Sequence, residues 1–198
     1  MFLHYKVEAA RKLRIGLDDC RTDSDTLKKR PQLRAVQGIR FWRDRVKLRD
    51  GAAHQSKTTH AAPEAIDACV AFAEVLADAI AGKPVSEMLK IRPDDYAAGI
   101  GKIMKGSWRG KQRQDIRASG YVAHTLEATL WSVGRTNDYR SAVLTAANLG
   151  EDADTTAAVA GQLAGALYGA SGIPQNWVSR VAWKEQIIEK ASNLLTAA

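Results

Sequence analysis

Residues 152–169, with the sequence DADTTAAVAGQLAGALYG, decide the fold. Small residues recur at every fourth position of this run, which places them along one stripe of a helix. Because a glycine inside a helix costs about 1 kcal/mol relative to alanine, their repeated use predicts that neighbouring backbones pack closely against this stripe. We therefore expect a deeply buried helix from Thr155 to Tyr168. The stripe consists of Ala157, Gly161, Gly165 and Gly169.

A second helix is predicted over residues 63–81. Pro63 suits the first helical position, and Gly82 with Pro84 marks the end. The acids Asp67, Glu74 and Asp78 fall on a different face from the apolar stripe. That stripe consists of Ile66, Val70, Ala73, Ala77 and Ile80.

The remaining periodic segments are also helical in spacing, and none alternates like a half-buried strand. We expect helices over 121–133, capped by Ser119, and over 139–149, capped by Asp138. Residues 106–119 are predicted to be mostly loop. The fold class is therefore all-α. In the helix at 121–133, Val122, Leu126, Leu130 and Val133 would face the core, and a further helix opening at Pro174 would carry Trp177, Val181, Ile187 and Ile188.

Length and composition predict one compact domain. A chain of 198 residues with 45% apolar content can bury one sizeable core. Its apolar runs are shorter than the roughly 18 to 20 residues of a membrane span, and residues 1–10 lack the apolar core of a secretory signal. Cys20 and Cys69 are too far apart in sequence for a paired zinc or disulfide motif. We expect a cytoplasmic protein that does not bind membranes.

The net charge of +7 is concentrated at the start of the chain. Residues 1–50 contain 14 Lys or Arg and 7 Asp or Glu, whereas residues 51–198 contain 15 of each. A basic segment is typical of a solvated helical face or of a nucleic-acid contact. Phe41 and Trp42 lie among arginines, but no nucleic-acid-reading motif accompanies them. We therefore do not expect nucleic acid as a partner.

An acidic turn precedes the glycine-striped helix. Asp152 and Asp154 lie two residues apart at the predicted helix start, followed by the hydroxyl of Thr155. Such hard oxygen donors suit Mg²⁺ or Mn²⁺, and the helix dipole favours negative charge at this end. The alternative is that Asp154 is an N-cap and Asp152 an exposed turn residue. The spacing alone leaves both interpretations open.

The longer run 150–169 resembles the C-terminal signature of the ADP-ribosylglycohydrolases. Residues 119–131 are similar to the preceding helix of that family, and residues 58–67 resemble its segment containing Thr-His-x-x-Pro. The resemblance covers residues 39–180 and fades upstream of Ile39. We accordingly divide the chain into a diverged basic segment, 1–38, and a helical domain, 39–198.

This resemblance implies an all-α hydrolase that uses two Mg²⁺ or Mn²⁺ ions to cleave the glycosidic bond between ADP-ribose and a protein side chain. The partner would then be an ADP-ribosylated protein or ADP-ribose itself. By resemblance, Asp152 and Asp154 would be catalytic and would bind metal together with Thr155. The ADP-ribose would lie near His60, Gly120 and Tyr121. Either a diphosphate contact or a solvated basic loop would account for Trp108, Arg109, Lys111 and Arg113.

One part of the family's pattern is missing. The family supplies further metal ligands from an upstream Thr-Asp-Asp-Thr run, whereas the adjacent acids near the start of this chain, Asp18 and Asp19, lack flanking threonines. The resemblance therefore implies one bound ion or none, in place of two. Two functions stay open: hydrolysis, or binding of ADP-ribose or a protein partner without catalysis. The chain would then be a fragment, a diverged homologue with a replaced N-terminus, or one half that needs a partner. Loss of the N-terminal helices would expose apolar faces and so favour self-association.

Overall fold

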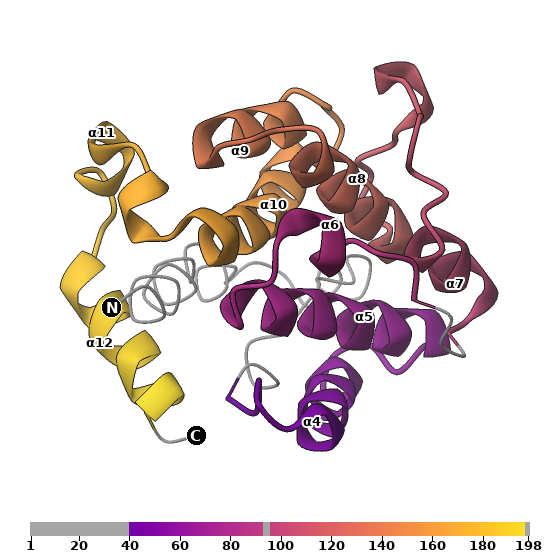
Figure 1. The fold of residues 1–198 in the computed structure, drawn as a ribbon, viewed down its shortest axis with the longest axis horizontal. Coiled ribbons are helices and arrows are strands. Elements are labelled where there is room, and N and C mark those ends of the chain that lie inside the picture. Colours follow the sequence, from indigo (N-terminus) through magenta and orange to yellow (C-terminus); the bar gives the residue numbers. More distant parts are fainter. Residues whose placement is uncertain (1–39, 93–95, 197–198) are drawn as a thin grey trace.

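The computed structural model describes residues 40–92 and 96–196, and this part of the chain is helical with no strand (Figure 1). The all-α prediction is confirmed. Segment 106–119 is mostly loop, as predicted. The described elements are α4 (Arg45–Lys57), α5 (Pro63–Ile80), α6 (Val85–Met88), α7 (Ala98–Met104), η1 (Arg113–Asp115), α8 (Val122–Gly134), α9 (Tyr139–Ala147), α10 (Ala153–Tyr168), η2 (Ala170–Gly172), α11 (Gln175–Val178) and α12 (Lys184–Thr196).

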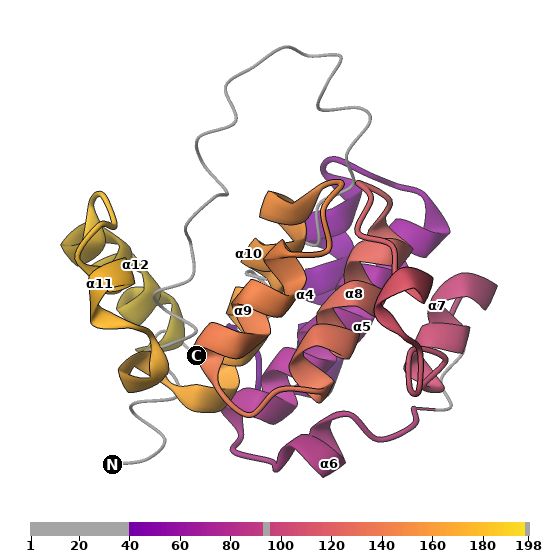
Figure 2. The ribbon, with the colours of Figure 1, turned by 90° about the horizontal axis from the view of Figure 1, so that it is seen from above.

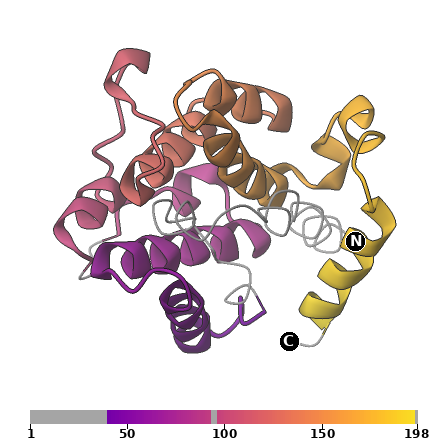
Figure 3. The same cartoon turned by 180° about the vertical axis from the view of Figure 1, so that it is seen from behind.

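Helices α5, α8 and α10 pack against one another and form the core. Helix α4 covers α5, and α9 packs against both α8 and α10. Figure 3 shows this arrangement from behind, with α12 lying at the side of the bundle. The α8 residues predicted to face the core are all at most 2% exposed: Val122, Leu126, Leu130 and Val133.

The glycine stripe of α10 is buried as predicted. Gly161 and Gly165 are both buried, and α10 packs against α5, α8 and α9. Close approach of three helices requires small side chains along the shared face. The helix ends at Gly169, whose φ of 78° is a conformation that glycine adopts without steric cost.

The acids of α5 are buried in a network of positive charges. Glu74 is 6% exposed and Asp78 is 2% exposed. From α4, Arg45 contacts Asp78, and the guanidinium of Arg49 lies 2.6 Å from the Glu74 carboxylate. Arg92 contacts both acids. Part of the positive charge of the first fifty residues therefore neutralises the core of the protein itself.

Two details differ from the sequence prediction. The helix expected from Pro174 onwards is two helices, α11 and α12, separated by a turn in which Trp183 has a φ of 53°. The expected cap Ser119 is also wrong, because the N-cap position of α8 is Tyr121. Asp138 does cap α9 by accepting the N–H of Ser141 at 2.8 Å.

Among the described helices, none combines the length and the apolar character needed to cross a membrane. Cys69 is buried in α5, and Cys20 lies outside the described residues.

Candidate functional site

The starts of α5, α8 and α10 meet at one end of the molecule. The main-chain N–H of Asp152 donates to the carbonyl of Ala118 at 2.9 Å, which joins the turn before α10 to the segment before α8. The phenol of Tyr121 donates to the carboxylate of Glu64, which joins the start of α8 to the first turn of α5. Figure 2 shows the three connections that lead into these helices side by side.

The acidic turn is braced by hydroxyl groups. Asp152 is half-buried at the N-cap position of α10. The hydroxyl of Thr155 donates to its Oδ1 atom at 3.0 Å, and the hydroxyl of Thr156 donates to its carbonyl at 3.1 Å. Asp154 lies in the first turn of the helix and is exposed. The interpretation of Asp154 as an N-cap is therefore wrong, because Asp152 occupies that position.

The donor chemistry of this turn fits a hard divalent cation, but the number of donors does not. Two carboxylates and a hydroxyl are the oxygen ligands that Mg²⁺ accepts, although Mg²⁺ requires six positions in near-octahedral geometry. Within residues 40–92 and 96–196, no group of three or more His, Cys, Asp or Glu side chains is arranged to hold a metal ion. Asp18 and Asp19 lie outside the described residues. Metal binding by Asp152, Asp154 and Thr155 stays a prediction.

Tyr121 lies at the surface beside the acidic turn. Its side chain is 43% exposed, and its ring contacts His124 edge-on at 5.0 Å between centroids. The Nδ1 atom of His124 is hydrogen-bonded to the hydroxyl of Ser119 at 2.7 Å. The hydrogen bond to Glu64 raises the pKa of the Tyr121 phenol to about 12, with burial as a smaller cause. Gly120 lies between Ser119 and Tyr121, and the hydrogen bonds of these two neighbours hold the segment in place.

His60 lies in the connection between α4 and α5, four residues before Glu64. Its N–H donates to the carbonyl of Ser56 at 2.7 Å, and the hydroxyl of Ser56 donates to the carbonyl of His60 at 3.1 Å. The His60 side chain is half-buried. These bonds fix the backbone at His60, and the sequence-predicted residues His60, Gly120, Tyr121 and Asp152 thus all belong to segments at the same end of the bundle.

Sequence reasoning missed the role of Glu64 and assigned none to His124. Glu64 belongs to the Thr-His-x-x-Pro segment that the resemblance identified, so its position was available. Its contact with Tyr121 was not, because the two residues are 57 positions apart. His124 is one helical turn from Tyr121, and that spacing could have indicated their contact.

The basic loop before α8 has structural contacts of its own. The guanidinium of Arg113 donates to the carbonyls of Asn148 and Leu149, at the C-terminal end of α9. The Lys111 ammonium lies 2.7 Å from the Glu127 carboxylate. The Trp108 ring lies against Gly134, at the end of α8 that is remote from Asp152. Trp108 and Lys111 therefore contact other parts of α8, whereas Arg113 lies next to the acidic turn, bonded to main-chain carbonyls just before it.

A sequence model of the ADP-ribosylglycohydrolase family matches residues 21–198. The chain belongs to this family. The match begins upstream of residue 39, in a part of the chain that the structure does not describe. The division of the chain at residues 38 and 39 stays a prediction.

Two curated relatives and one solved structure illustrate the similarity. The ADP-ribosylarginine hydrolase Tri1 of Pseudomonas putida (strain GB-1) is 45% identical over 149 residues, covering 73% of this chain and 39% of the relative. The ADP-ribosyl-[dinitrogen reductase] glycohydrolase of Rhodospirillum rubrum is 38% identical over 82 residues, covering 41% of this chain and 28% of the relative. A solved structure described as an ADP-ribosylglycohydrolase-related protein complex has a TM-score of 0.74 and 26% identity, covering 99% of this chain and 71% of that one.

The chain spans about two fifths of the length of the hydrolase from P. putida, and the same share of an ADP-ribosylarginine hydrolase Tri1 from Serratia proteamaculans (strain 568), to which it is 40% identical.

Proposed function

We propose that this chain binds the ADP-ribose group of an ADP-ribosylated protein at the end where α5, α8 and α10 begin, and contributes to hydrolysis of the bond that holds this group. The observation that carries the proposal is the hydrogen bond from the Asp152 N–H to the Ala118 carbonyl. It places the acidic turn beside the segment containing Gly120 and Tyr121, which are the residues that the family resemblance assigns to ADP-ribose.

The names of the relatives support arginine as the modified side chain. The bond broken would be the glycosidic bond at C1 of the ribose, with water as the second substrate and arginine and ADP-ribose as products. A Mg²⁺ or Mn²⁺ ion held by Asp152, Asp154 and Thr155 would supply positive charge for orienting the ribose hydroxyls. The Thr155 hydroxyl, by donating to Oδ1 of Asp152, holds this carboxylate in one orientation.

Release of ADP-ribose from a mono-ADP-ribosylated arginine peptide, in Mg²⁺ or Mn²⁺, tests the hydrolase proposal. We expect turnover that falls by at least about a hundredfold in Asp152→Asn and in Asp154→Asn, since each removes one charged ligand without changing shape. Glu151→Gln is the matched control, because Glu151 is an exposed neighbouring acid on the same turn. If both aspartate variants keep full activity, or the native chain releases nothing, the hydrolase proposal fails.

A second candidate function is binding of ADP-ribose without turnover. It is favoured by the finding that residues 40–92 and 96–196 contain no cluster of three metal-binding side chains. Titration calorimetry with ADP-ribose and Mg²⁺ distinguishes the two functions, because binding heat without release of product supports this second one. Absence of heat from the native chain counts against both.

A further inference from the structure

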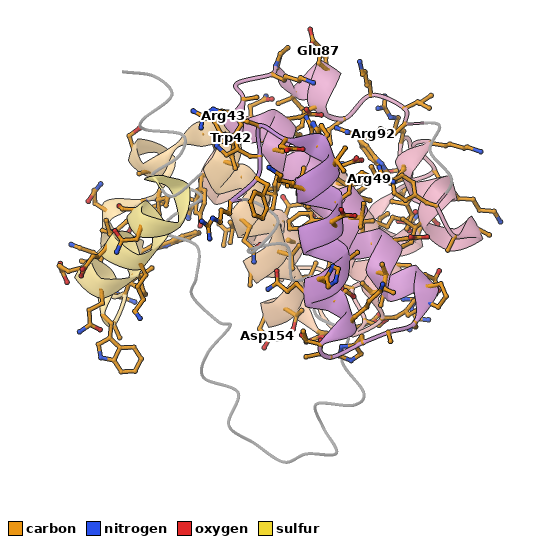
Figure 4. All side chains as sticks on the ribbon, turned by 90° about the horizontal axis from the view of Figure 1, so that it is seen from below. Trp42, Arg43, Arg49, Glu87, Arg92 and Asp154 are labelled. Atoms are coloured by element: carbon orange, nitrogen blue, oxygen red, sulfur yellow. The ribbon has the colours of Figure 1, made fainter. Side chains whose placement is uncertain are left out.

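A second hollow lies at the other end of α8. A groove of about 510 Å³ runs between α6, the loop at residues 108–112 and the C-terminal end of α8. Helix α8 has 13 residues, so about 18 Å of helix separates this groove from the segment at Tyr121. Figure 4 places Glu87 of α6 and Asp154 of α10 at opposite ends of the molecule. The groove is therefore distinct from the acidic turn.

The walls of the groove are fixed by two tryptophans. The indole N–H of Trp131 donates to the carbonyl of Lys111 at 2.9 Å, which ties the loop to α8. The Trp108 ring lies directly over Gly134, so closely that a Cβ atom there would lie 2.8 Å from it. Trp108 is only 8% exposed and Trp131 only 5% exposed. A rigid wall of this kind lowers the entropic cost of binding.

All the charged side chains that line the groove are positive. Its lining includes Arg109, Lys111 and Arg135 but no Asp or Glu, although residues 51–198 contain as many acids as bases. Lys111 is paired with Glu127, which lies behind the lining. Arg109 and Arg135 thus remain as the two exposed cations of the groove.

Both arginines are stacked on the indoles. The guanidinium of Arg135 lies 4.1 Å from the Trp131 ring centroid, and that of Arg109 lies 5.1 Å from the Trp108 ring centroid. Stacking holds each guanidinium by cation–π attraction. The Nη2 atom of Arg109 also donates to the carbonyl of Leu89, so Arg135 offers its N–H edge for a bidentate contact with a carboxylate, and Arg109 adds a positive charge with its remaining N–H groups. At the rim, the site of a Gly110 Cβ atom has no neighbour within 4 Å, so the groove is open along the surface.

We propose that this groove docks an acidic peptide segment of a protein partner. Its cations complement carboxylates, and its open, elongated form fits a chain better than an enclosed small molecule. Nucleic acid fits less well, because base recognition on aromatic side chains requires a ring face, and each indole has an arginine over it. The proposal is independent of ADP-ribose binding.

Fluorescence anisotropy with a labelled peptide of about twelve alternating Glu and Ser residues tests the proposal on the full chain. We expect the Kd to rise at least about tenfold in Arg109→Gln/Arg135→Gln, as is usual for the loss of central arginine contacts. It should change less than about twofold in Lys102→Gln/Arg140→Gln, which removes the same charge from exposed positions outside the groove. Circular dichroism checks that both variants are folded.

Three outcomes overturn the proposal. The first is equal weakening in both double variants, which would indicate non-specific attraction to a basic protein. The second is absence of peptide binding to the native chain. The third is displacement of the peptide by a single-stranded oligonucleotide at lower concentration than by unlabelled peptide, which would assign the groove to nucleic acid.

Discussion

The phenol of Tyr121 donates a hydrogen bond to the carboxylate of Glu64, across 57 positions of sequence. This bond ties the start of α8 to the start of α5 at the surface where we place ADP-ribose. It also leaves a measurable signature, because it raises the pKa of the phenol to about 12.

Glu64→Gln should lower the pKa of Tyr121 towards its ordinary value of 10.0. The charged acceptor disfavours the phenolate, and an amide removes that repulsion without changing the shape. Ultraviolet absorbance between about pH 9 and pH 13 measures the ionisation. Because burial also raises the pKa of Tyr139 to about 12, Tyr121→Phe is needed to assign the shifted phenol. A titration curve unchanged by Glu64→Gln would contradict the hydrogen bond.

Asp78→Asn should destabilise the protein by about 3 kcal/mol at neutral pH, because it leaves Arg45, Lys83 and Arg92 without their shared buried carboxylate. Burial opposes ionisation of Asp78, but hydrogen bonds from Lys83 and Arg92 outweigh it and lower the pKa below 3.8. Urea unfolding measures the difference. The exposed Asp50→Asn on α4 should change stability by less than about 0.5 kcal/mol.

The stability difference between the native protein and Asp78→Asn should depend on pH. With a folded-state pKa below the unfolded value, Asp78 contributes its full stabilisation above about pH 5 and loses it as the pH falls through the folded pKa. The native protein and Asp78→Asn should therefore converge in stability at acid pH. A constant difference between them from about pH 7 to pH 3 would show that the ionisation of Asp78 is not the source of the effect.

Arg113→Met should lower the free energy of unfolding by about 1 kcal/mol and leave ADP-ribose binding unchanged. The guanidinium donates to carbonyls at the end of α9, where a cation also interacts favourably with the helix dipole. Thermal unfolding and calorimetry measure the two effects. Arg117→Met is the comparison, since its surface pair with Glu151 at 3.4 Å should contribute little. Weaker ADP-ribose binding in Arg113→Met would instead assign Arg113 to the diphosphate.

The parts of the fold that depend on local spacing could be predicted from the sequence. The glycine stripe at Gly161 and Gly165 is a property of one helix, and it correctly indicated close packing. Helix α4 was missed because its many charged residues give no apolar stripe. Its arginines are stabilised by Glu74 and Asp78, which lie 25 to 33 residues further along the chain. The spacing of apolar residues in the sequence does not reveal such distant ion pairs.

In the candidate site, too, local contacts could be predicted from the sequence, whereas contacts between helices could not. The Asp152 and Thr155 contact spans three residues and follows from the turn before a helix. The bond from Asp152 to Ala118 and the bond from Tyr121 to Glu64 join different helices, so they depend on how the bundle packs. The number of metal donors within reach of Asp154 likewise depends on tertiary structure, and the sequence pattern could only suggest the type of donor.

Gly134→Ala should destabilise the protein by about 1 kcal/mol, although alanine ordinarily favours a helix. The new Cβ atom would lie 2.8 Å from the Trp108 ring and 3.2 Å from a Leu89 methyl group. Overpacking of this kind costs about 1 to 3 kcal/mol, which exceeds the roughly 1 kcal/mol that alanine gains from its helix propensity. Because Trp108 also forms a wall of the basic groove, displacement of its ring should weaken binding of the acidic peptide. Trp108→Phe provides space for the methyl group, so Gly134→Ala should cost less in that background. Urea unfolding of the four proteins measures this coupling, and simple additivity of the two substitutions would show that the ring does not rest on Gly134.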